Sequence, residues 1–242
     1  MKKLITLIII CAAVVSSSCN DNCVQKTYSG TLVVDITDST IVQQFQRESD
    51  AVVNGLSPSK INRCEGVKVD IVPIGSTIEN QTVSVSYPAS GVLANDIGGY
   101  ALEDSNVAKS IYLKQHINAA LNNFTSVGDS KSQIFYTINY LLQHKTGRCI
   151  IFTDLLENYD RKISFYKPGY DFETTLNKMI DLYGIDTTVK TAFGGKLTIV
   201  TPMSKNQDKV LYARSFYKFY FAKVGLSPNQ YEFVGSLSQS KF

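Results

Sequence analysis

The sequence has few of the residues on which the commonest catalytic and zinc centres depend. Only two histidines occur among its 242 residues, His116 and His144, and no Cys/His cluster has the spacing of metal ligands. It has no glycine-rich phosphate loop, no Ser-His-Asp arrangement and no evident pair of acid and base. These absences argue against a zinc centre and against hydrolysis by an activated nucleophile, so we do not expect an enzyme.

A strong excess of charge of either sign is also missing. The formal net charge is +3, and removal of an N-terminal signal takes away Lys2 and Lys3 and leaves +1. Proteins that bind nucleic acid carry a clear basic excess, usually as a dense patch of Lys and Arg. We therefore expect no nucleic-acid partner.

The only long apolar run lies near the N-terminus and is too short to be a stable membrane span. Residues 4–15 are apolar, they follow a basic start, and three serines then lead to Cys19. This order is typical of a secretory signal. The small residues before Cys19 resemble a bacterial lipobox, in which the cysteine is lipidated and becomes the mature N-terminus; Ser16 stands where Leu is usual. An ordinary signal, cleaved near Ser18, is the alternative.

These features predict how the chain is divided. We expect a lipoprotein signal peptide at residues 1–18, a polar tether at 19–29, one domain at 30–235 and a polar tail at 236–242. With 44% hydrophobic residues, the chain can bury a full core. Lipidation implies a protein of the bacterial cell envelope that contacts the membrane through its lipid anchor, at the outer membrane or the periplasmic face.

Two segments far apart in the chain share one pattern, an apolar run that ends in an aspartate flanked by hydroxyls. Residues 32–34 lead to Asp35, and residues 149–152 lead to Thr153 and Asp154. Continuous apolar runs are typical of strands that are buried on both faces of an α/β sheet. Because ligands bind such sheets at the carboxyl ends of the strands, we expect both aspartates on the same rim.

Strands and helices alternate along the rest of the chain. This alternation predicts an α/β, Rossmann-like fold with a mostly parallel central sheet and helices on both faces. The predicted strands are residues 31–35, 67–74, 82–87, 149–153, 197–201 and 231–234, and the predicted helices are residues 40–54, 107–124, 133–144, 172–183 and 208–224.

Oxygen ligands follow the first predicted strand at close spacing. Asp35, Thr37 and Ser39 place one carboxylate and two hydroxyls on a single turn. Such hard donors suit Mg²⁺ and are poor ligands for zinc or copper. Taken alone, an aspartate in this place is most often a helix cap that binds the free amides of the next helix. Asp38 fits a charge at the helix start better than an outer ligand of a metal.

This pattern resembles the metal-ion-dependent adhesion site of the von Willebrand factor A (vWA) family, which uses Asp-x-Ser-x-Ser after its first strand. The family adds a Thr from a loop between helices and an Asp after its fourth strand. Asp35, Thr37 and Ser39 match the first motif, and Asp154 matches the last. The resemblance implies a vWA-like fold and a bound Mg²⁺, with Mn²⁺ or Ca²⁺ as substitutes.

The middle ligand falls in a segment rich in serine. We favour Ser132, because a helical apolar pattern starts directly after it, with Ser130 as the alternative. The chain departs from the family at two points. A serine replaces the threonine of the middle loop, and Leu155 stands where a glycine commonly follows the last aspartate.

Three of the five cysteines lie beyond Cys19. Cys23 and Cys64 each precede one of the first two predicted strands by a few residues. If those strands are adjacent and parallel, both cysteines fall at the same end of the sheet and could form a disulfide, which persists in an oxidising compartment. Cys149 begins a buried strand and is expected to pack as a small hydrophobic residue.

The resemblance implies a binding module, because in that family the metal binds a carboxylate offered by a protein ligand. We therefore expect a lipid-anchored envelope module that captures a protein partner through an Asp or Glu of that partner. Two alternatives stay open. The chain could be a structural subunit of an envelope assembly with an empty site or, with less support, an envelope hydrolase of Rossmann-like fold.

Overall fold

A single six-stranded sheet organises the part of the chain that the computed structural model describes, which is residues 26–58, 61, 65–75, 82–88, 102–125, 131–145, 147–158, 165, 171–185, 193–202 and 206–240. The strands lie in the order β3-β2-β1-β4-β5-β6, and all neighbours are parallel except β3, which is antiparallel to β2. Their bounds are β1 Lys26–Asp35, β2 Glu65–Ile74, β3 Val83–Tyr87, β4 Arg148–Phe152, β5 Leu197–Val200 and β6 Tyr231–Val234.

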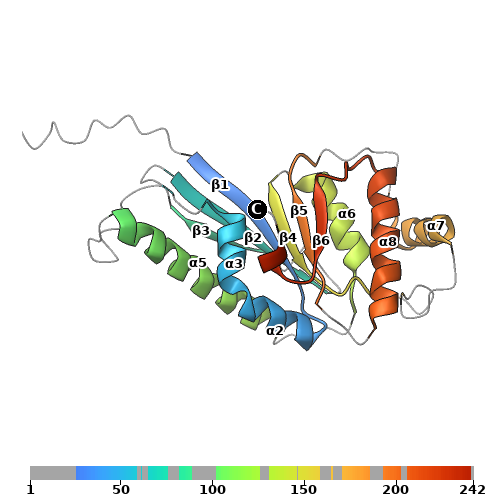
Figure 1. The fold of residues 1–242 in the computed structure, drawn as a ribbon, viewed down its shortest axis with the longest axis horizontal. Coiled ribbons are helices and arrows are strands. Elements are labelled where there is room, and N and C mark those ends of the chain that lie inside the picture. Colours follow the sequence, from blue (N-terminus) through green and yellow to red (C-terminus); the bar gives the residue numbers. More distant parts are fainter. Residues whose placement is uncertain are drawn as a thin grey trace, which may run out of the picture.

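Helices cover both faces of this sheet (Figure 1). Alternate residues of β1 point to opposite faces, so Leu32 and Val34 join one buried cluster while Val33 joins the other. The first cluster includes side chains of α2 (Ser39–Arg47), α3 (Ser49–Leu56) and α5 (Leu102–Thr125). The second includes side chains of α6 (Ile134–His144), α7 (Phe172–Tyr183) and α8 (Gln207–Lys223). The predicted α/β architecture is confirmed.

The direction in which the chain adds strands reverses between β1 and β4. From β1 the chain proceeds outward to β2 and β3, and it then returns to place β4, β5 and β6 on the other side. The connections therefore diverge at the carboxyl ends of β1 and β4, which are adjacent parallel strands. In open α/β sheets, this switch point is where ligands bind.

Several element bounds differ from those predicted. β1 begins at Lys26, inside the segment predicted as a tether, because residues 26–29 pair in parallel with residues 65–68 of β2. The predicted helix at 40–54 is two helices, which meet at Glu48. The segment predicted as a polar tail forms a 3₁₀ turn, η1 (Leu237–Gln239), and Leu237 is buried against the α3 face with its amide donating to Glu48 Oε2 at 2.6 Å.

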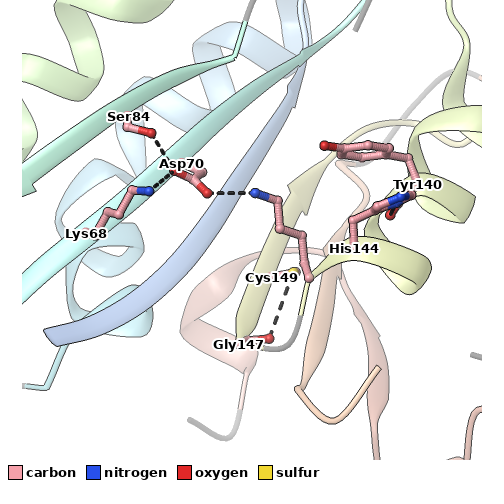
Figure 2. Close-up of polar contacts among 8 residues, drawn as sticks. Lys68, Asp70, Ser84, Tyr140, His144, Gly147 and Cys149 are labelled. Atoms are coloured by element: carbon pink, nitrogen blue, oxygen red, sulfur yellow. Dashed lines mark hydrogen bonds and ion pairs between the residues drawn. The ribbon is translucent and has the colours of Figure 1, made fainter. Parts of the chain in front are cut away.

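The parallel pairing of β1 with β2 confirms the adjacency on which the predicted disulfide depends. The disulfide partners Cys23 and Cys64, and the predicted lipidation site Cys19, lie outside the described residues. Cys149 is a buried free thiol near the start of β4, and burial raises its pKa to about 12 (Figure 2). As predicted, it packs as a small hydrophobic residue.

Polar side chains connect β2, β3 and the segment before β4. Lys145 donates to Asp70 Oδ2 at 2.7 Å, and Ser84 donates to Asp70 Oδ1 at 2.6 Å; Figure 2 shows Asp70 between Lys68 and Ser84. The nearby ammonium of Lys145 and these hydrogen bonds outweigh partial burial and hold the pKa of Asp70 below its usual value.

None of the described helices combines the length and apolar character that a membrane span requires.

Candidate functional site

Asp35 is the last residue of β1, and its carboxylate lies at the centre of a cluster of hydroxyl groups. The side chain is only 1% exposed. Its Oδ1 accepts from the Thr37 amide at 3.1 Å and from Thr37 Oγ1 at 2.6 Å. Thr153 Oγ1 donates to its Oδ2 at 3.2 Å, and Ser132 Oγ lies 3.3 Å from the same oxygen. Within the described residues, every side-chain partner of this carboxylate is therefore a hydroxyl.

The three hydroxyls come from three separate parts of the chain. Thr37 follows β1, Ser132 lies just before α6, and Thr153 follows β4. Thr37 Oγ1 and Ser132 Oγ are also 2.8 Å apart, so these two hydroxyls contact each other as well as Asp35. The switch point between β1 and β4 brings these segments together, as the motif order predicts.

Asp38, and not Asp35, caps the helix that follows. The side chain of Asp38 accepts from the Thr40 amide at 2.7 Å and is the N-cap of α2. This is the role expected of Asp38. Asp35 instead accepts from its own turn and from distant hydroxyls, so the capping interpretation does not explain its placement.

The described contacts of two other predicted ligands are of a different kind. Ser39 is the first residue of α2 and is exposed, and no hydrogen bond among the described residues connects it to Asp35. Asp154 is 7% exposed, and its Oδ1 accepts from the Leu156 amide at 2.8 Å, which folds the chain back after β4. Ser130, the alternative to Ser132, lies outside the described residues.

Leu155 has an unusual backbone conformation. Its φ is +64°, and it is the only residue other than glycine with positive φ in the described part of the chain. This is the place where the vWA family commonly has glycine, the residue that adopts such a φ without strain. The leucine is fully buried, and its amide donates to Thr153 Oγ1 at 3.0 Å. Packing of the side chain therefore holds the turn that a glycine would otherwise permit.

Glu157 is a buried acid in the loop after β4. From the sequence, Glu157 and Asn158 form a polar pair that could reach the rim, although a polar pair in a loop needs no such role. It is fully buried, with its Oε2 accepting from the Phe135 amide at 2.8 Å and its Oε1 accepting from the Tyr183 hydroxyl. Burial, with a smaller contribution from the charge of Asp35, raises the pKa of Glu157 to about 8. The only sequence signal for a buried role of Glu157 is its position, directly after Thr153, Asp154 and two leucines.

Two buried carboxyl groups, those of Asp35 and Glu157, lie here without a described counter-charge. Burial raises the pKa of Asp35, although hydrogen bonds from Thr37, Thr153 and Ser132 oppose that rise. Within the described residues, no Lys or Arg forms an ion pair with Asp35 or Glu157. A buried carboxylate without a cation is costly, and a bound metal ion removes that cost.

The spacing of the oxygens fits a small divalent cation. Asp35 Oδ1, Thr37 Oγ1 and Ser132 Oγ form a triangle with sides of 2.6, 2.8 and 3.4 Å. Around octahedral Mg²⁺, neighbouring ligand oxygens are about 3 Å apart, since each lies about 2.1 Å from the ion. The triangle is therefore close in size to one face of an octahedron, and its two shorter sides are also ordinary hydrogen-bond distances. No group of three or more His, Cys, Asp or Glu in the described part forms a metal site, so such a site depends on its hydroxyls.

Two comparisons with known proteins found no match. No protein-family model matches the chain. No curated protein matches it either.

Proposed function

We propose that this chain is a vWA-like binding module that holds Mg²⁺ at the rim between β1 and β4 and captures a carboxylate of a partner protein. Asp35, Thr37 and Ser132 would bind the ion directly, and Ser39 and Asp154 would complete the set. Mn²⁺ or Ca²⁺ could replace Mg²⁺, since both accept oxygen ligands. The bound ion would supply an electrophilic coordination position for an anionic oxygen.

One observation carries this proposal. The triangle of Asp35 Oδ1, Thr37 Oγ1 and Ser132 Oγ assembles a carboxylate and two hydroxyls from segments far apart in the chain. A structural role does not require a carboxylate that is 1% exposed to be surrounded by hydroxyls and to have no described cation. A cation site accounts for both features.

Access supports the capture of a partner. Thr37 is half-buried and Ser39 is exposed, whereas Asp35 is buried beneath them. A ligand carboxylate would therefore approach from the side of Ser39 and Thr37. Because nucleophilic catalysis needs an activated group that the described residues do not supply here, we propose binding without turnover.

The location of the protein is part of this proposal. The N-terminal pattern ending at Cys19 supports a lipid anchor in the bacterial cell envelope. The module would then present its rim to proteins outside the membrane that carries the anchor. A structural subunit with an empty site is the second candidate. It is favoured by Ser39, a predicted ligand that is exposed and has no hydrogen bond to Asp35 among the described residues.

Calorimetric titration of the mature protein with MgCl₂ tests the proposal. We expect saturable binding that Asp154→Ala abolishes, while Asp50→Ala, which removes an exposed acid paired with Lys114, leaves it intact. At a hundredfold excess over the dissociation constant, Mg²⁺ should stabilise the wild type by about 2.7 kcal/mol relative to EDTA. Absence of Mg²⁺ and Mn²⁺ binding to the wild type would favour the structural subunit. Turnover of generic ester or phosphate substrates would favour a hydrolase.

A further inference from the structure

Helix α6 begins without a capping side chain of its own. Its N-cap residue, Gln133, makes no side-chain capping bond, and its first turn contains no acidic residue. Free amides at a helix start need acceptors, particularly where the helix is buried as here. Ile134 and Phe135, the first two residues of α6, are fully buried.

Glu157 supplies the missing acceptor from another part of the chain. Its Oε2 accepts from the Phe135 amide at 2.8 Å, and its Oε1 accepts from the Tyr183 hydroxyl of α7. The side chain is fully buried, so solvent does not compete for these bonds. A capping residue contributed in this way fixes the position of the helix start relative to the loop that carries the cap.

That loop also contains Asp154 and is itself rigidly held. Leu155 and Leu156 are buried to within 1% exposure, and the Glu157 amide donates to Leu155 O at 3.1 Å. The backbone of the next residue, Asn158, donates to Ser132 O at 3.5 Å and forms an isolated antiparallel bridge with Ser132. The loop after β4 therefore contacts the chain at Ser132 itself and at Phe135, three residues later.

We propose that Glu157 is the positioning residue of the rim site, which holds the start of α6 so that Ser132 Oγ lies against Asp35. Ser132 is three residues before Phe135, so a helix start held by Glu157 also limits where the Ser132 hydroxyl can lie. The carboxyl group of Glu157 acts through Ser132 and does not itself bind the ion. This inference rests on the proposed function, because it concerns the affinity of the same site.

Titration of the mature protein with MgCl₂ tests the inference in three variants. Glu157→Ala removes both acceptors and should weaken Mg²⁺ binding at least tenfold. Glu157→Gln should stay within threefold of the wild type, because its amide oxygen can accept from Phe135 and its amide nitrogen can donate to the Tyr183 oxygen. Glu157→Asp keeps the acid but shortens it by one methylene, so it should weaken binding more than the glutamine does.

Asp171→Ala is the matched control. Asp171 caps α7 through the Thr174 amide at 2.8 Å, so the variant loses a helix cap in a different helix. It should lower the melting temperature and leave Mg²⁺ affinity unchanged. If Glu157→Ala does not fold, the comparison of Glu157→Asp with Glu157→Gln decides the question, since equal affinities of these two would overturn the proposal.

Hydrogen exchange separates this inference from the proposed function. In metal-free protein, the Phe135 amide should exchange faster in Glu157→Asp than in the wild type or in Glu157→Gln. If the wild type binds no Mg²⁺ but exchange follows this order, the proposed function fails and Glu157 keeps only its capping role, so the positioning role fails with it. If the wild type binds Mg²⁺ and every Glu157 variant binds it equally well, only the positioning role is overturned.

Discussion

Replacement of Asp35 by asparagine should make the metal-free protein more stable while it abolishes metal binding. The asparagine has the same shape, its side-chain oxygen can accept from the Thr37 amide and hydroxyl, and its amide can donate to the hydroxyls of Thr153 or Ser132. What the substitution removes is the charge. Because Asp35 is 1% exposed and burial raises its pKa, ionisation at neutral pH is unfavourable in the folded state compared with the unfolded state.

The size of the gain follows from linkage. A carboxyl whose pKa is higher in the folded state lowers stability as pH rises from its unfolded value to its folded value, and each unit of difference corresponds to about 1.4 kcal/mol. We expect Asp35→Asn to be more stable than the wild type at pH 7 in EDTA, because burial raises the pKa of Asp35. For a domain of this size, each kcal/mol gained raises the melting temperature by roughly 2–4 °C.

Thermal melts at pH 7, with EDTA and with millimolar MgCl₂, measure both effects. The wild type should be less stable than Asp35→Asn in EDTA and should gain stability on addition of Mg²⁺, whereas the variant should not respond to Mg²⁺. Asp50→Asn, on the exposed surface, should respond as the wild type does. A lower melting temperature for Asp35→Asn in EDTA would refute the reasoning, because it would mean that the ionised carboxylate stabilises the fold through its hydrogen bonds.

Other predictions concern the second buried acid and the N-terminal region. The folded pKa of Glu157 is about 8, well above its usual value of 4.5, so its contribution to stability should be lost as pH rises from about 4.5 to about 8. Urea unfolding in EDTA should show a free energy of unfolding that falls over this pH range in the wild type and falls less in Glu157→Gln. Cys19→Ser should release the exported protein from membranes, and fractionation that finds it still tightly bound would rule out lipidation as the anchor. Thiol counting on denatured, unreduced mature protein should give one free sulfhydryl, Cys149, whereas three would exclude the bridge between Cys23 and Cys64.

Local pattern was sufficient to predict most elements of the fold. α7 and β6 have the predicted bounds, Phe172–Tyr183 and Tyr231–Val234. For α7 the local signals are a capping aspartate before the helix and a glycine with positive φ after it. The polar start of β1 could not be predicted in this way. Residues 26–29 become a strand only because β2 offers them a partner, and pairing between distant segments leaves no local signal.

The candidate site, like the fold, could be predicted only where local sequence features specify the residues. The motif predicts that Asp35, Thr37 and Ser132 come together, since it specifies residue types at strand and helix ends, where the topology brings them to one rim. The role of Glu157 was missed, because it depends on the uncapped start of α6 and on a tyrosine of α7. A polar residue in a loop has no sequence feature that distinguishes burial from exposure.

The length and direction of β1 set the distance between the point where the N-terminal segment joins the sheet and the rim. β1 runs through ten residues, from Lys26, which follows the predicted anchor segment, to Asp35. At about 3.3 Å per residue, its two ends are roughly 30 Å apart. If Cys19 is acylated, the lipid would be attached on the side of the chain that precedes Lys26, and the hydroxyl cluster would lie at the other end of the strand. The length of β1 would then separate the site from the residue at which the anchor segment joins the sheet.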